Sequence, residues 1–464
     1  MLMTMNHCSD LQEILVRAQR AGVRLVRVLY CDNAGLMRTK AVWIDDLPAR
    51  MKSGIGFPLA QQALTAFDEP APVEGLGPVG EFRLVPEPAT FVVLPYVGET
   101  ACLFGTMYTL DGSPWEACPR AFLGRMLSRL GERGLRARVG SEHEFSLARR
   151  AQGAFPYQPA DAAPLFGAAA LDAHHLFLSP WLAALIRQGL RPRLVHAEYG
   201  PGQMEVSLAP AEALQAADQV CLLRETTRAV AAQQGLVASF APKPYVERFA
   251  GNGLHLHLSL WGGEGSEQAG HNRFYEASEP TLLSTLARHV IGGLLAHLPA
   301  LVALTCASVN SYERMLPHHW SSAYRCWGLD NREAAIRVPS TSWGEVAESL
   351  RLELRCADHS ANPYLALGAL LAAGLDGIER ELEPGEPLTV DPGALSEQER
   401  RRLGILRLPT RLSEALEALE RDAVLTEALG PRLSTAYLAV KRQEVAFCQE
   451  RTPQDIAALY FEKY

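Results

Sequence analysis

Hydrophobic and polar residues alternate with two different periods in the N-terminal part of the chain. Residues 11–23, LQEILVRAQRAGV, space apolar side chains three and four apart, which predicts an amphipathic helix. Residues 25–43 are typical of two strands joined by a turn at Asn33-Ala34-Gly35. Short apolar runs at 89–97 and 101–108 predict further strands. This part is therefore predicted to be a small α/β unit.

Two Pro- and Gly-rich stretches interrupt the pattern. Residues 70–88 are predicted to be loops, and DGSPWEACPR, residues 111–120, is predicted to be a domain boundary. A chain of 464 residues is too long for one hydrophobic core. We therefore expect a small domain over residues 1–112 and a large one over 113–464.

Both periods continue in the large domain. Helical spacing predicts helices at 120–134, 211–234, 279–305 and 412–429, and strands are predicted at 136–148, 193–208 and 252–261. The apolar run at 289–309 approaches the length of a membrane span. His297 and Pro299 interrupt it and no basic cluster flanks it, so it is predicted to be a buried core helix that breaks near the proline.

Composition narrows the class of protein. Hydrophobic residues make up 48% and charged residues 21%, which is ordinary for a soluble globular protein. The net charge of −8 argues against nucleic-acid and anionic-membrane partners, which attract basic faces. Nine cysteines without a CxxC pair, and an N-terminus without a secretory pattern, indicate a reduced, cytoplasmic protein. Neither a P-loop nor a GxGxxG motif is present.

Acidic residues recur two apart in segments of strand character. Glu142 and Glu144 in GSEHEFSL share one strand face because side chains alternate along a strand. Glu198 and Glu205 flank a Gly-Pro-Gly turn in HAEYGPGQMEVSL. A solvated strand edge would explain such carboxylates, and so would a divalent cation that neutralises them.

Two more segments place chemically active groups on one face. GNGLHLHLSL interleaves His255 and His257 with leucines, and RLELR places Arg351, Glu353 and Arg355 opposite two leucines. A barrel-like sheet with a polar interior would collect these groups. Several Glu and one or two His suit Mg²⁺ or Mn²⁺, with His favouring Mn²⁺. Metals together with arginines favour phosphoryl transfer.

Together, these segments carry an ordered set of motifs: GSEHEF, EYGPGQME, APKP, GNGLHLHLS, NSYERM, NREAAIR and RLELRCADHSANPYL. They span residues 115–380 in the order found in the glutamine synthetase family, which the chain therefore resembles. The resemblance implies an α+β fold with an N-terminal β-grasp domain and a catalytic domain built on an antiparallel, barrel-like sheet with flanking helices. It also implies a homo-oligomer, a ring dodecamer with its sites at subunit interfaces.

The resemblance also implies roles for individual residues. Ligands of a first metal ion match Glu144, Glu198 and Glu205, and ligands of a second match Glu142, His255 and Glu353. Nucleotide-binding positions hold His257, Ser259, Arg337 and Arg351. Glutamate-binding positions hold Gly251, His255, Arg314 and Arg355. Arg332 and Arg337 match catalytic arginines, although each arginine taken singly could be a structural ion pair. Two or more Mg²⁺ or Mn²⁺ ions and ATP are implied.

The implied chemistry has two steps. The γ-carboxylate of glutamate attacks the γ-phosphate of ATP, and a nitrogen nucleophile then attacks the γ-glutamyl phosphate to give an amide. The residues fit this order on chemical grounds, because a carboxylate accepts nitrogen poorly until one oxygen becomes a good leaving group.

The segment LPHHWSSA departs from the pattern of enzymes that use ammonia. They carry a glutamate in this flap, where the chain has Trp320. A second acid is usual in the N-terminal domain of those enzymes. The corresponding segment here, MKSGIGFPLAQQ, contains none, and the first acid after it is Asp68. Two acidic contributors to an ammonium site are therefore predicted to be absent.

An organic amine fits these changes better than ammonium. Its methylenes pack on an aromatic ring, and its charge gains about 0.5–2 kcal/mol over an indole. Trp320 and Phe57 therefore favour a polyamine, ethanolamine or alkylamine, and the W…WGxxNREAA pattern is similar to that of family members that use such amines. His318 or His319 is the predicted proton acceptor, because imidazole is available at neutral pH.

Three alternatives stay open at this point. Trp320 could be a plain hydrophobic lid that excludes water from the glutamyl phosphate. Ammonia could be the substrate, with Asp68 or Glu69 as the second acid. A non-catalytic structural or regulatory ring is also conceivable, although all six metal-ligand positions are filled.

Overall fold

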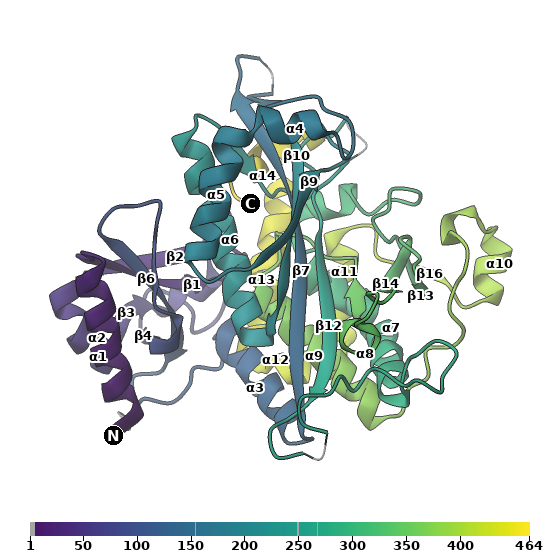
Figure 1. Ribbon diagram of the computed structural model, residues 1–464, viewed down its shortest axis with the longest axis horizontal. Helices are drawn as coiled ribbons and strands as arrows, with labels where there is room; N and C mark the ends of the chain where they lie inside the picture. Colours follow the sequence, from purple (N-terminus) through teal and green to yellow (C-terminus); the bar gives the residue numbers. More distant parts are fainter. Residues whose placement is uncertain (1–4, 154, 248–249, 267) are drawn as a thin grey trace.

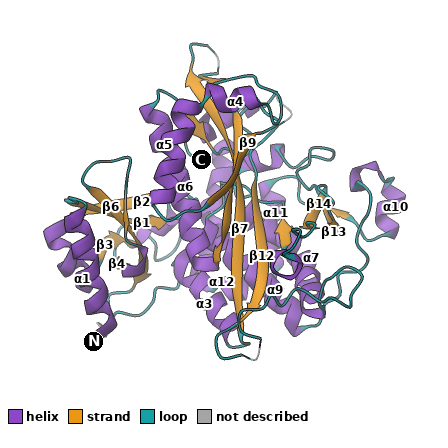
Figure 2. Ribbon diagram, viewed as in Figure 1, coloured by secondary structure: helices purple, strands orange, loops and turns teal. Residues whose placement is uncertain are grey.

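The computed structural model describes residues 5–153, 155–247, 250–266 and 268–464 (Figure 1). A small N-terminal unit lies beside a larger one that holds the long strands. Helices and sheets occur in both units (Figure 2), which confirms the predicted α+β class. The predicted boundary at 112/113 stays a prediction.

The small unit packs helices on a six-stranded sheet of order β2-β1-β6-β4-β3, with β5 paired to β6. Its elements are α1 (Met5–Arg20), β1 (Leu25–Cys31), β2 (Met37–Trp43), α2 (Leu47–Ser53), β3 (Ile55–Pro58), β4 (Glu81–Pro86), β5 (Val92–Val93) and β6 (Thr100–Tyr108). β1 is antiparallel to β2 and parallel to β6. The predicted helix and hairpin are therefore confirmed.

Two predictions for the small unit were wrong in detail, and one strand was missed. The predicted loop at 70–88 contains β4, the run at 89–97 has only the two-residue β5, and β3 was not predicted. Phe82 and Leu84 of β4 are fully buried while their neighbours are exposed or half-buried, so the two-residue period was present. The flanking Gly and Pro residues favoured a loop over this two-residue period when the sequence was interpreted, although such residues also mark strand ends.

The large unit is built on a ten-stranded sheet of order β16-β13-β14-β15-β12-β7-β10-β9, with β8 and β11 also paired to β7. Its strands are β7 (Leu135–Arg150), β8 (Tyr157–Pro159), β9 (Pro192–Ala197), β10 (Gln203–Glu212), β11 (Val237–Ser239), β12 (Leu254–Gly262), β13 (Tyr324–Leu329), β14 (Ala334–Val338), β15 (Leu352–Leu354) and β16 (Leu406–Arg407). β13 and β14 are parallel. The central strands β9, β10, β7, β12 and β15 are antiparallel, as predicted.

Helices pack against this sheet and form much of the core. They are α3 (Pro119–Gly131), α4 (Ala168–Ala173), α5 (His175–Arg187), α6 (Ala213–Gln233), α7 (Thr285–Thr305), α8 (Val346–Ser349), α9 (Pro363–Glu379), α10 (Glu397–Arg402), α11 (Leu412–Arg421), α12 (Ala423–Leu429), α13 (Pro431–Cys448) and α14 (Pro453–Phe461). The helices predicted from periodicity correspond to α3, α6, α7 and the pair α11–α12.

Helix α7 is a core helix, as predicted, but it does not break at Pro299. It is long and apolar enough to cross a membrane by length and composition, yet 67% of its most apolar window is buried. α7 and α9 pack so closely that a Cβ on Gly293 or Gly377 would lie about 2 Å from a backbone oxygen of the other helix. This packing offsets the one hydrogen bond lost at the proline.

A buried ion pair joins the C-terminal helices to the small unit. Lys441 Nζ lies 3.0 Å from Glu444 Oε2, and both side chains are fully buried. The other oxygen of Glu444 accepts the backbone N–H of Ala66 at 2.8 Å. The hydroxyl of Tyr464 donates to Ala34 O at 2.7 Å. The end of the chain therefore holds two N-terminal loops in place.

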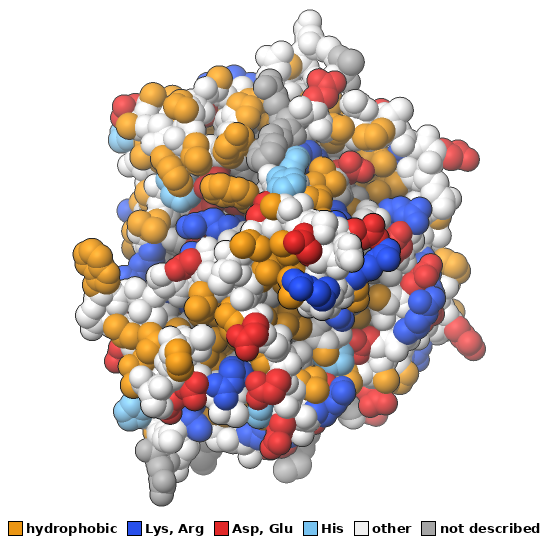
Figure 3. Space-filling model, turned by 90° about the vertical axis from the view of Figure 1, so that its right-hand side faces the viewer, with side chains coloured by type: hydrophobic (Ala, Val, Ile, Leu, Met, Phe, Trp, Pro, Cys, Tyr) orange, Lys and Arg blue, Asp and Glu red, His pale blue; other side chains and the backbone are white. Residues whose placement is uncertain are grey.

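The outer surface mixes acidic, basic and hydrophobic side chains. Figure 3 shows this on the side that carries α10 and β13, where red and blue side chains lie close together. Exposed pairs such as Arg442–Glu420, at 2.6 Å, contribute little to stability because water screens them. The eight cysteines whose side chains are described are free and buried.

Replacing Glu444 with leucine is expected to lower the thermal midpoint strongly. Lys441 would then be a buried charge without its partner, at a cost of about 3–5 kcal/mol. Thermal unfolding followed by circular dichroism measures the effect. Glu420→Leu, which breaks an exposed pair, is the matched control and should shift the midpoint little. Equal shifts in the two variants would contradict the structural role of the buried pair.

Candidate functional site

Strand register brings the acidic and imidazole groups onto one face of the large sheet. On β7, Glu144 lies opposite Glu205 of β10, and Glu142 lies opposite His255 of β12. One strand further, Glu353 of β15 lies opposite His257. Side chains directly opposite each other on antiparallel strands are neighbours. The alternation visible in the sequence therefore becomes a continuous polar row across four strands.

Two clusters along this row have the composition of metal sites. The ligand atoms of His196, Glu198 and Glu205 lie within 4.8 Å of one another, as do those of Glu142, His257 and Glu353. These groupings differ from the predicted sets, which had Glu144 in the first and His255 in the second. The ligand roles themselves stay predictions.

Glu144 and His255 lie between the two clusters. Glu144 Oε2 accepts the N–H of Gly253 at 2.8 Å and the amide of Gln203 at 3.1 Å, which leaves Oε1 with more freedom. His255 Nδ1 lies 3.0 Å from Glu142 Oε2, and its Nε2 lies 3.9 Å from Glu144 Oε1. His255 therefore adjoins the second cluster through Glu142, and Glu144 lies opposite Glu205 of the first.

His196 was missed by the sequence analysis. It lies directly opposite Glu205 on β9, and its ring nitrogens lie 3.6–3.7 Å from Glu205 and Glu198. Its position two residues before Glu198 has the same two-residue spacing as Glu142 and Glu144. That alternation could have identified it.

Crowding of like charges makes the first cluster a poor place for carboxylates alone. Burial and the nearby charge of Glu144 raise the pKa of Glu198 to about 7. The same two causes raise the pKa of Glu205 to about 10. Without a cation these carboxyls therefore hold protons near neutral pH.

In the second cluster, the ionised carboxylates are stabilised by neighbouring histidine and arginine side chains. Burial acts to raise the pKa of Glu142, but hydrogen bonds from His255 and His257 outweigh it and hold the pKa well below its usual range. Burial also opposes ionisation of Glu353, yet the Arg355 guanidinium lowers its pKa to about 2. Arg337 NH1 donates to the same carboxylate at 2.8 Å. Glu353 is thus a fully buried anion between two arginines.

The donor set fits Mg²⁺ or Mn²⁺. Carboxylate oxygens predominate, imidazole nitrogens complete each cluster, and no cysteine joins either of them. A divalent cation would remove the repulsion that keeps Glu198 and Glu205 protonated. The residues present therefore suit the ions that the family resemblance implies.

Most of the predicted site residues line one cavity of about 410 Å³. The predicted residues in its lining are Glu142, Glu144, Glu198, Glu205, Gly251, His255, Arg314, His319, Trp320, Arg332, Arg337 and Arg355. Glu353 lies beneath it, bound to Arg337 and Arg355. His257, Ser259 and Arg351 lie outside the lining, where Arg351 Nε donates to His257 Nδ1 at 3.3 Å.

Positive charge faces the acidic row across this cavity. Arg314 is 5% exposed and donates to Ala357 O at 2.8 Å, and no ion pair is found for it among the described residues. A Cβ on Gly251 would lie 2.7 Å from Arg314 Cγ, so the glycine permits this packing. Arg332 likewise forms no ion pair in the described part of the chain. These cations are available to an anionic ligand.

The flap places its predicted residues on two different sides. Trp320 and His319 line the cavity. His318 does not: its side chain is 59% exposed, and its Nδ1 lies 2.7 Å from Asp391 Oδ2. The backbone of His318 is left-handed, with φ of 64°, and its side chain lies at the outer surface of this subunit. Its predicted catalytic role stays a prediction.

Phe57 was also predicted at the amine site, and in the structure it is a buried residue of the small unit. It is 5% exposed and stacks on Phe82 at 5.5 Å, with Tyr30 edge-on at 5.3 Å. Lys40 covers it at 4.2 Å. Phe57 is a core residue of the small unit, a role that apolar residues in short strands commonly have.

The chain matches known proteins over almost its whole length. Residues 11–115 match the family model described as the glutamine synthetase N-terminal domain, and residues 116–460 match the glutamine synthetase catalytic domain. This chain belongs to the glutamine synthetase family. It is an ATP-dependent carbon–nitrogen ligase of that family.

Two curated relatives are equally similar in sequence. The gamma-glutamylpolyamine synthetase GlnA3 of Streptomyces coelicolor is 36% identical over 445 residues, covering 96% of this chain and 94% of the relative. The glutamine synthetase of Pyrococcus horikoshii is 36% identical over 424 residues, covering 91% and 89%. Sequence identity alone therefore leaves the nitrogen substrate of this ligase open.

Solved structures of the glutamine synthetase family have the same fold. A crystal structure described as a novel glutamine synthase homologue has a TM-score of 0.84 and 37% identity, covering 95% of this chain and 99% of the other. A complex of GmaS with ADP has a TM-score of 0.83 and 29% identity, covering 95% and 97%.

Stability of the metal-free ligase is expected to fall as pH rises. Because the pKa of Glu198 is raised to about 7 and that of Glu205 to about 10, the folded protein holds protons that the unfolded chain releases near pH 4.5. This stabilisation is complete below about pH 4.5 and is lost as pH rises through 7 for Glu198 and through 10 for Glu205. Added Mg²⁺ or Mn²⁺ should therefore raise the thermal midpoint more at pH 8 than at pH 6.

The measurement is a thermal scan with chelator or with metal at both pH values. Glu205→Gln should reduce the metal-induced shift at pH 8. Glu212→Gln, at the exposed end of β10, is the matched control and should leave the shift unchanged. A shift that is independent of pH would contradict proton displacement at the first cluster.

Proposed function

We propose that the protein joins glutamate to an organic amine through γ-glutamyl phosphate, with ATP as the phosphoryl donor. The observation that carries this proposal is one cavity that combines an acidic row, unpaired arginines and an indole. The acids suit cations that hold phosphates, the arginines suit carboxylates, and the indole suits an alkylammonium. A polyamine, ethanolamine or a short alkylamine is the nitrogen substrate.

ATP would lie along β12, with its phosphates towards the cavity. His255, His257, Ser259 and Trp261 follow one another at alternate positions of this strand. Trp261 Nε1 donates to Ser259 Oγ at 2.8 Å, and Arg138 lies over its ring at 4.8 Å. Arg337 and Arg351 flank the same path and would contact phosphate oxygens. Bound cations would neutralise phosphate charge and polarise the γ-phosphate.

Glutamate would lie against the opposite wall. Arg314 supplies a guanidinium that forms no ion pair with the described residues, which fits the α-carboxylate of an amino acid. Gly251 permits close approach of the substrate backbone beside it. Arg355 lies near the γ-carboxylate end, because it also contacts Glu353 at the second cluster.

The proposed reaction has two steps. A γ-carboxylate oxygen attacks the γ-phosphorus, the bond to ADP breaks, and Arg332 and Arg337 stabilise the charge on the transferred group. The neutral amine nitrogen attacks the γ-carbonyl carbon, and the phosphate leaves and takes up the proton that this nitrogen loses. The ammonium form bound at the indole must first give up one proton to become the neutral nucleophile. His319 is the candidate acceptor for that proton, because it lines the cavity beside Trp320.

Ammonia is the second candidate nitrogen substrate. The similarity to the glutamine synthetase of Pyrococcus horikoshii favours it as strongly as the similarity to GlnA3 favours a polyamine. Asp68, a possible second acid, is bound at 2.6 Å to Arg38 in the small unit. We favour an organic amine because the flap presents Trp320 where a carboxylate would hold ammonium.

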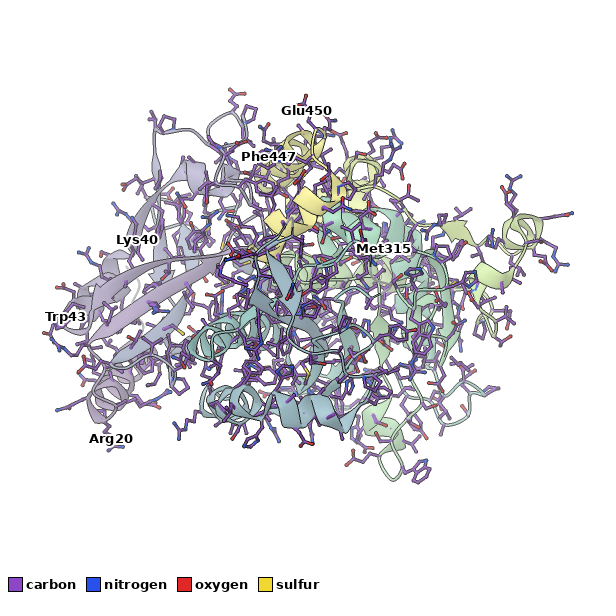
Figure 4. All side chains as sticks on the ribbon, turned by 90° about the horizontal axis from the view of Figure 1, so that it is seen from above. Arg20, Lys40, Trp43, Met315, Phe447 and Glu450 are labelled. Atoms are coloured by element: carbon purple, nitrogen blue, oxygen red, sulfur yellow. The ribbon has the colours of Figure 1, made fainter. Side chains whose placement is uncertain are left out.

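The proposed assembly is a ring dodecamer, as is usual in this generally oligomeric family. Seen from above, Lys40 and Trp43 lie at the far side of the small unit, well away from Met315 at the base of the flap (Figure 4). The N-terminal domain of a neighbouring copy would therefore have to cap each cavity. The cytoplasm is the proposed compartment.

A phosphate-release assay tests the proposal. Purified protein receives ATP, Mg²⁺, glutamate and one of ammonium, ethanolamine, putrescine, spermidine or methylamine, and mass spectrometry identifies the product. We expect turnover with an organic amine at lower concentration than with ammonium. Turnover with ammonium alone would identify a glutamine synthetase, and no phosphate release with any amine would indicate a non-catalytic ring.

Trp320→Ala is expected to raise KM for the organic amine by roughly 2- to 30-fold, the factor that a cation–π contact corresponds to. KM for ATP and glutamate should change little, since Trp320 is proposed to contact only the amine. Steady-state kinetics with each substrate varied in turn measure this. Trp343→Ala, at a fully exposed tryptophan, is the matched control. If Trp320 were only a hydrophobic lid, Trp320→Ala would instead increase phosphate release in the absence of amine and leave KM for the amine unchanged.

Arg314→Gln is expected to raise KM for glutamate by roughly 10- to 100-fold, because a charge-assisted hydrogen bond to a carboxylate is lost. KM for ATP should stay close to its original value. Arg325→Gln on β13, outside the cavity lining, is the control. An unchanged KM for glutamate would remove Arg314 from the substrate site.

A further inference from the structure

The peptide of Trp320 is held at both of its polar groups by charged side chains. Its N–H donates to Glu333 Oε1 at 2.7 Å, and its carbonyl oxygen accepts from Arg355 NH2 at 3.2 Å. Hydrogen bonds to charged groups are stronger than neutral ones. The backbone that carries the indole is therefore fixed from two sides.

This fixation matters because the flap has an unfavourable backbone conformation. His318, Trp320 and Ser322 have φ of 64°, 53° and 64°, values that non-glycine residues rarely adopt. Such conformations persist only where the surroundings hold them. Asp391 holds His318 and Ala334 O accepts from Ser322 Oγ at 3.0 Å, so each of the three has its own partner.

Glu333 is an unusual choice for a buried position. It is 7% exposed, and its Oε2 is buried without a hydrogen-bond partner among the described residues. It forms no ion pair in the described part of the chain, although Arg355, His318 and Asp391 are near enough to influence its charge. A buried carboxylate with one hydrogen bond is costly, and an apolar residue would pack there at lower cost. Folding stability therefore does not explain why a glutamate occupies this position.

The position of Glu333 links the flap to the reaction centre. It directly follows Arg332, which lines the cavity, and directly precedes β14, which carries Arg337. Arg355 connects the same Trp320 peptide to the buried Glu353. The indole is thus attached through two short contacts to the residues proposed to handle phosphate.

We propose that Glu333 is a positioning residue for amine specificity, which holds Trp320 in its left-handed conformation so that the indole stays at the cavity. This rests on the proposed function, because the amine is the substrate that Trp320 contacts. Glu333 itself does not touch substrate. The ligand class is an amine whose ammonium group adjoins methylene carbons, since only such an amine gains from an indole kept in place.

The test uses variants that separate hydrogen bonding from packing. Glu333→Gln keeps a side-chain carbonyl that can accept the Trp320 N–H. Glu333→Met has no oxygen to accept it, and the hydroxyl of Glu333→Ser is too close to the backbone to reach it. Asp391→Asn, which alters the neighbouring anchor at His318, is the matched control. Each full-length variant is assayed for KM of amine, glutamate and ATP, and the amide exchange of residues 316–325 is followed by mass spectrometry.

We expect Glu333→Met and Glu333→Ser to raise KM for the organic amine, and the exchange rate at Trp320, by roughly tenfold or more, the factor for one lost charge-assisted hydrogen bond. KM for ATP and glutamate should stay within about twofold, since the phosphate-side contacts remain. Glu333→Gln should recover most of both effects, and Asp391→Asn should leave the exchange at Trp320 unchanged.

Two results would overturn the proposal. One is unchanged exchange at Trp320 in both non-accepting variants, and the other is an equal rise of KM for all three substrates, which indicates general damage. Because exchange needs no substrate, it tests the anchor even if the wild type uses ammonium only. Exclusive use of ammonium by the wild type would reject the proposed organic amine, whereas an unchanged exchange rate at Trp320 would reject the role of Glu333.

Discussion

The site depends on one electrostatic constraint, which is that neighbouring carboxylates on β7 and β10 cannot all be ionised without a cation between them. Register places Glu144 opposite Glu205, and Glu198 follows within reach, so burial and mutual repulsion raise the pKa of Glu198 and Glu205. A fold selected only for stability would not gather these groups. A divalent cation held by these carboxylates would remove the repulsion and would supply a positive charge suited to phosphate.

The rest of the fold keeps this arrangement rigid. Closely packed helices cover the apolar face of the sheet, and the tight contact between α7 and α9 leaves no room for side chains at their crossing. Glu353 lies at the base of the cavity, where Arg337 and Arg355 compensate its charge. Arg355 also holds the carbonyl of Trp320. The second acidic cluster, these two arginines and the flap are therefore joined by one continuous set of contacts.

Much of this could be predicted from the sequence, because strand alternation assigns Glu142 and Glu144 to one face of their strand and His255 and His257 to one face of another. The motifs then assigned the chain to its family, which the matches to both domains confirm. Contacts that depend on backbone direction could not be predicted. The left-handed φ of His318 sends its side chain to Asp391, and Glu333, thirteen residues beyond Trp320, turns back to bind its N–H. The burial of Phe57 could not be predicted either, because an apolar residue in a short strand is equally consistent with a core and with a binding site.

The central claim is that the γ-carboxylate of glutamate is phosphorylated before nitrogen attacks it. Glutamate labelled with ¹⁸O in the γ-carboxylate tests this directly, with the released phosphate analysed by mass spectrometry after turnover with the preferred amine. The account predicts one ¹⁸O atom in each phosphate released, because the oxygen that attacks phosphorus leaves with it. Unlabelled phosphate, formed while amide accumulates, would contradict the mechanism proposed for this cavity.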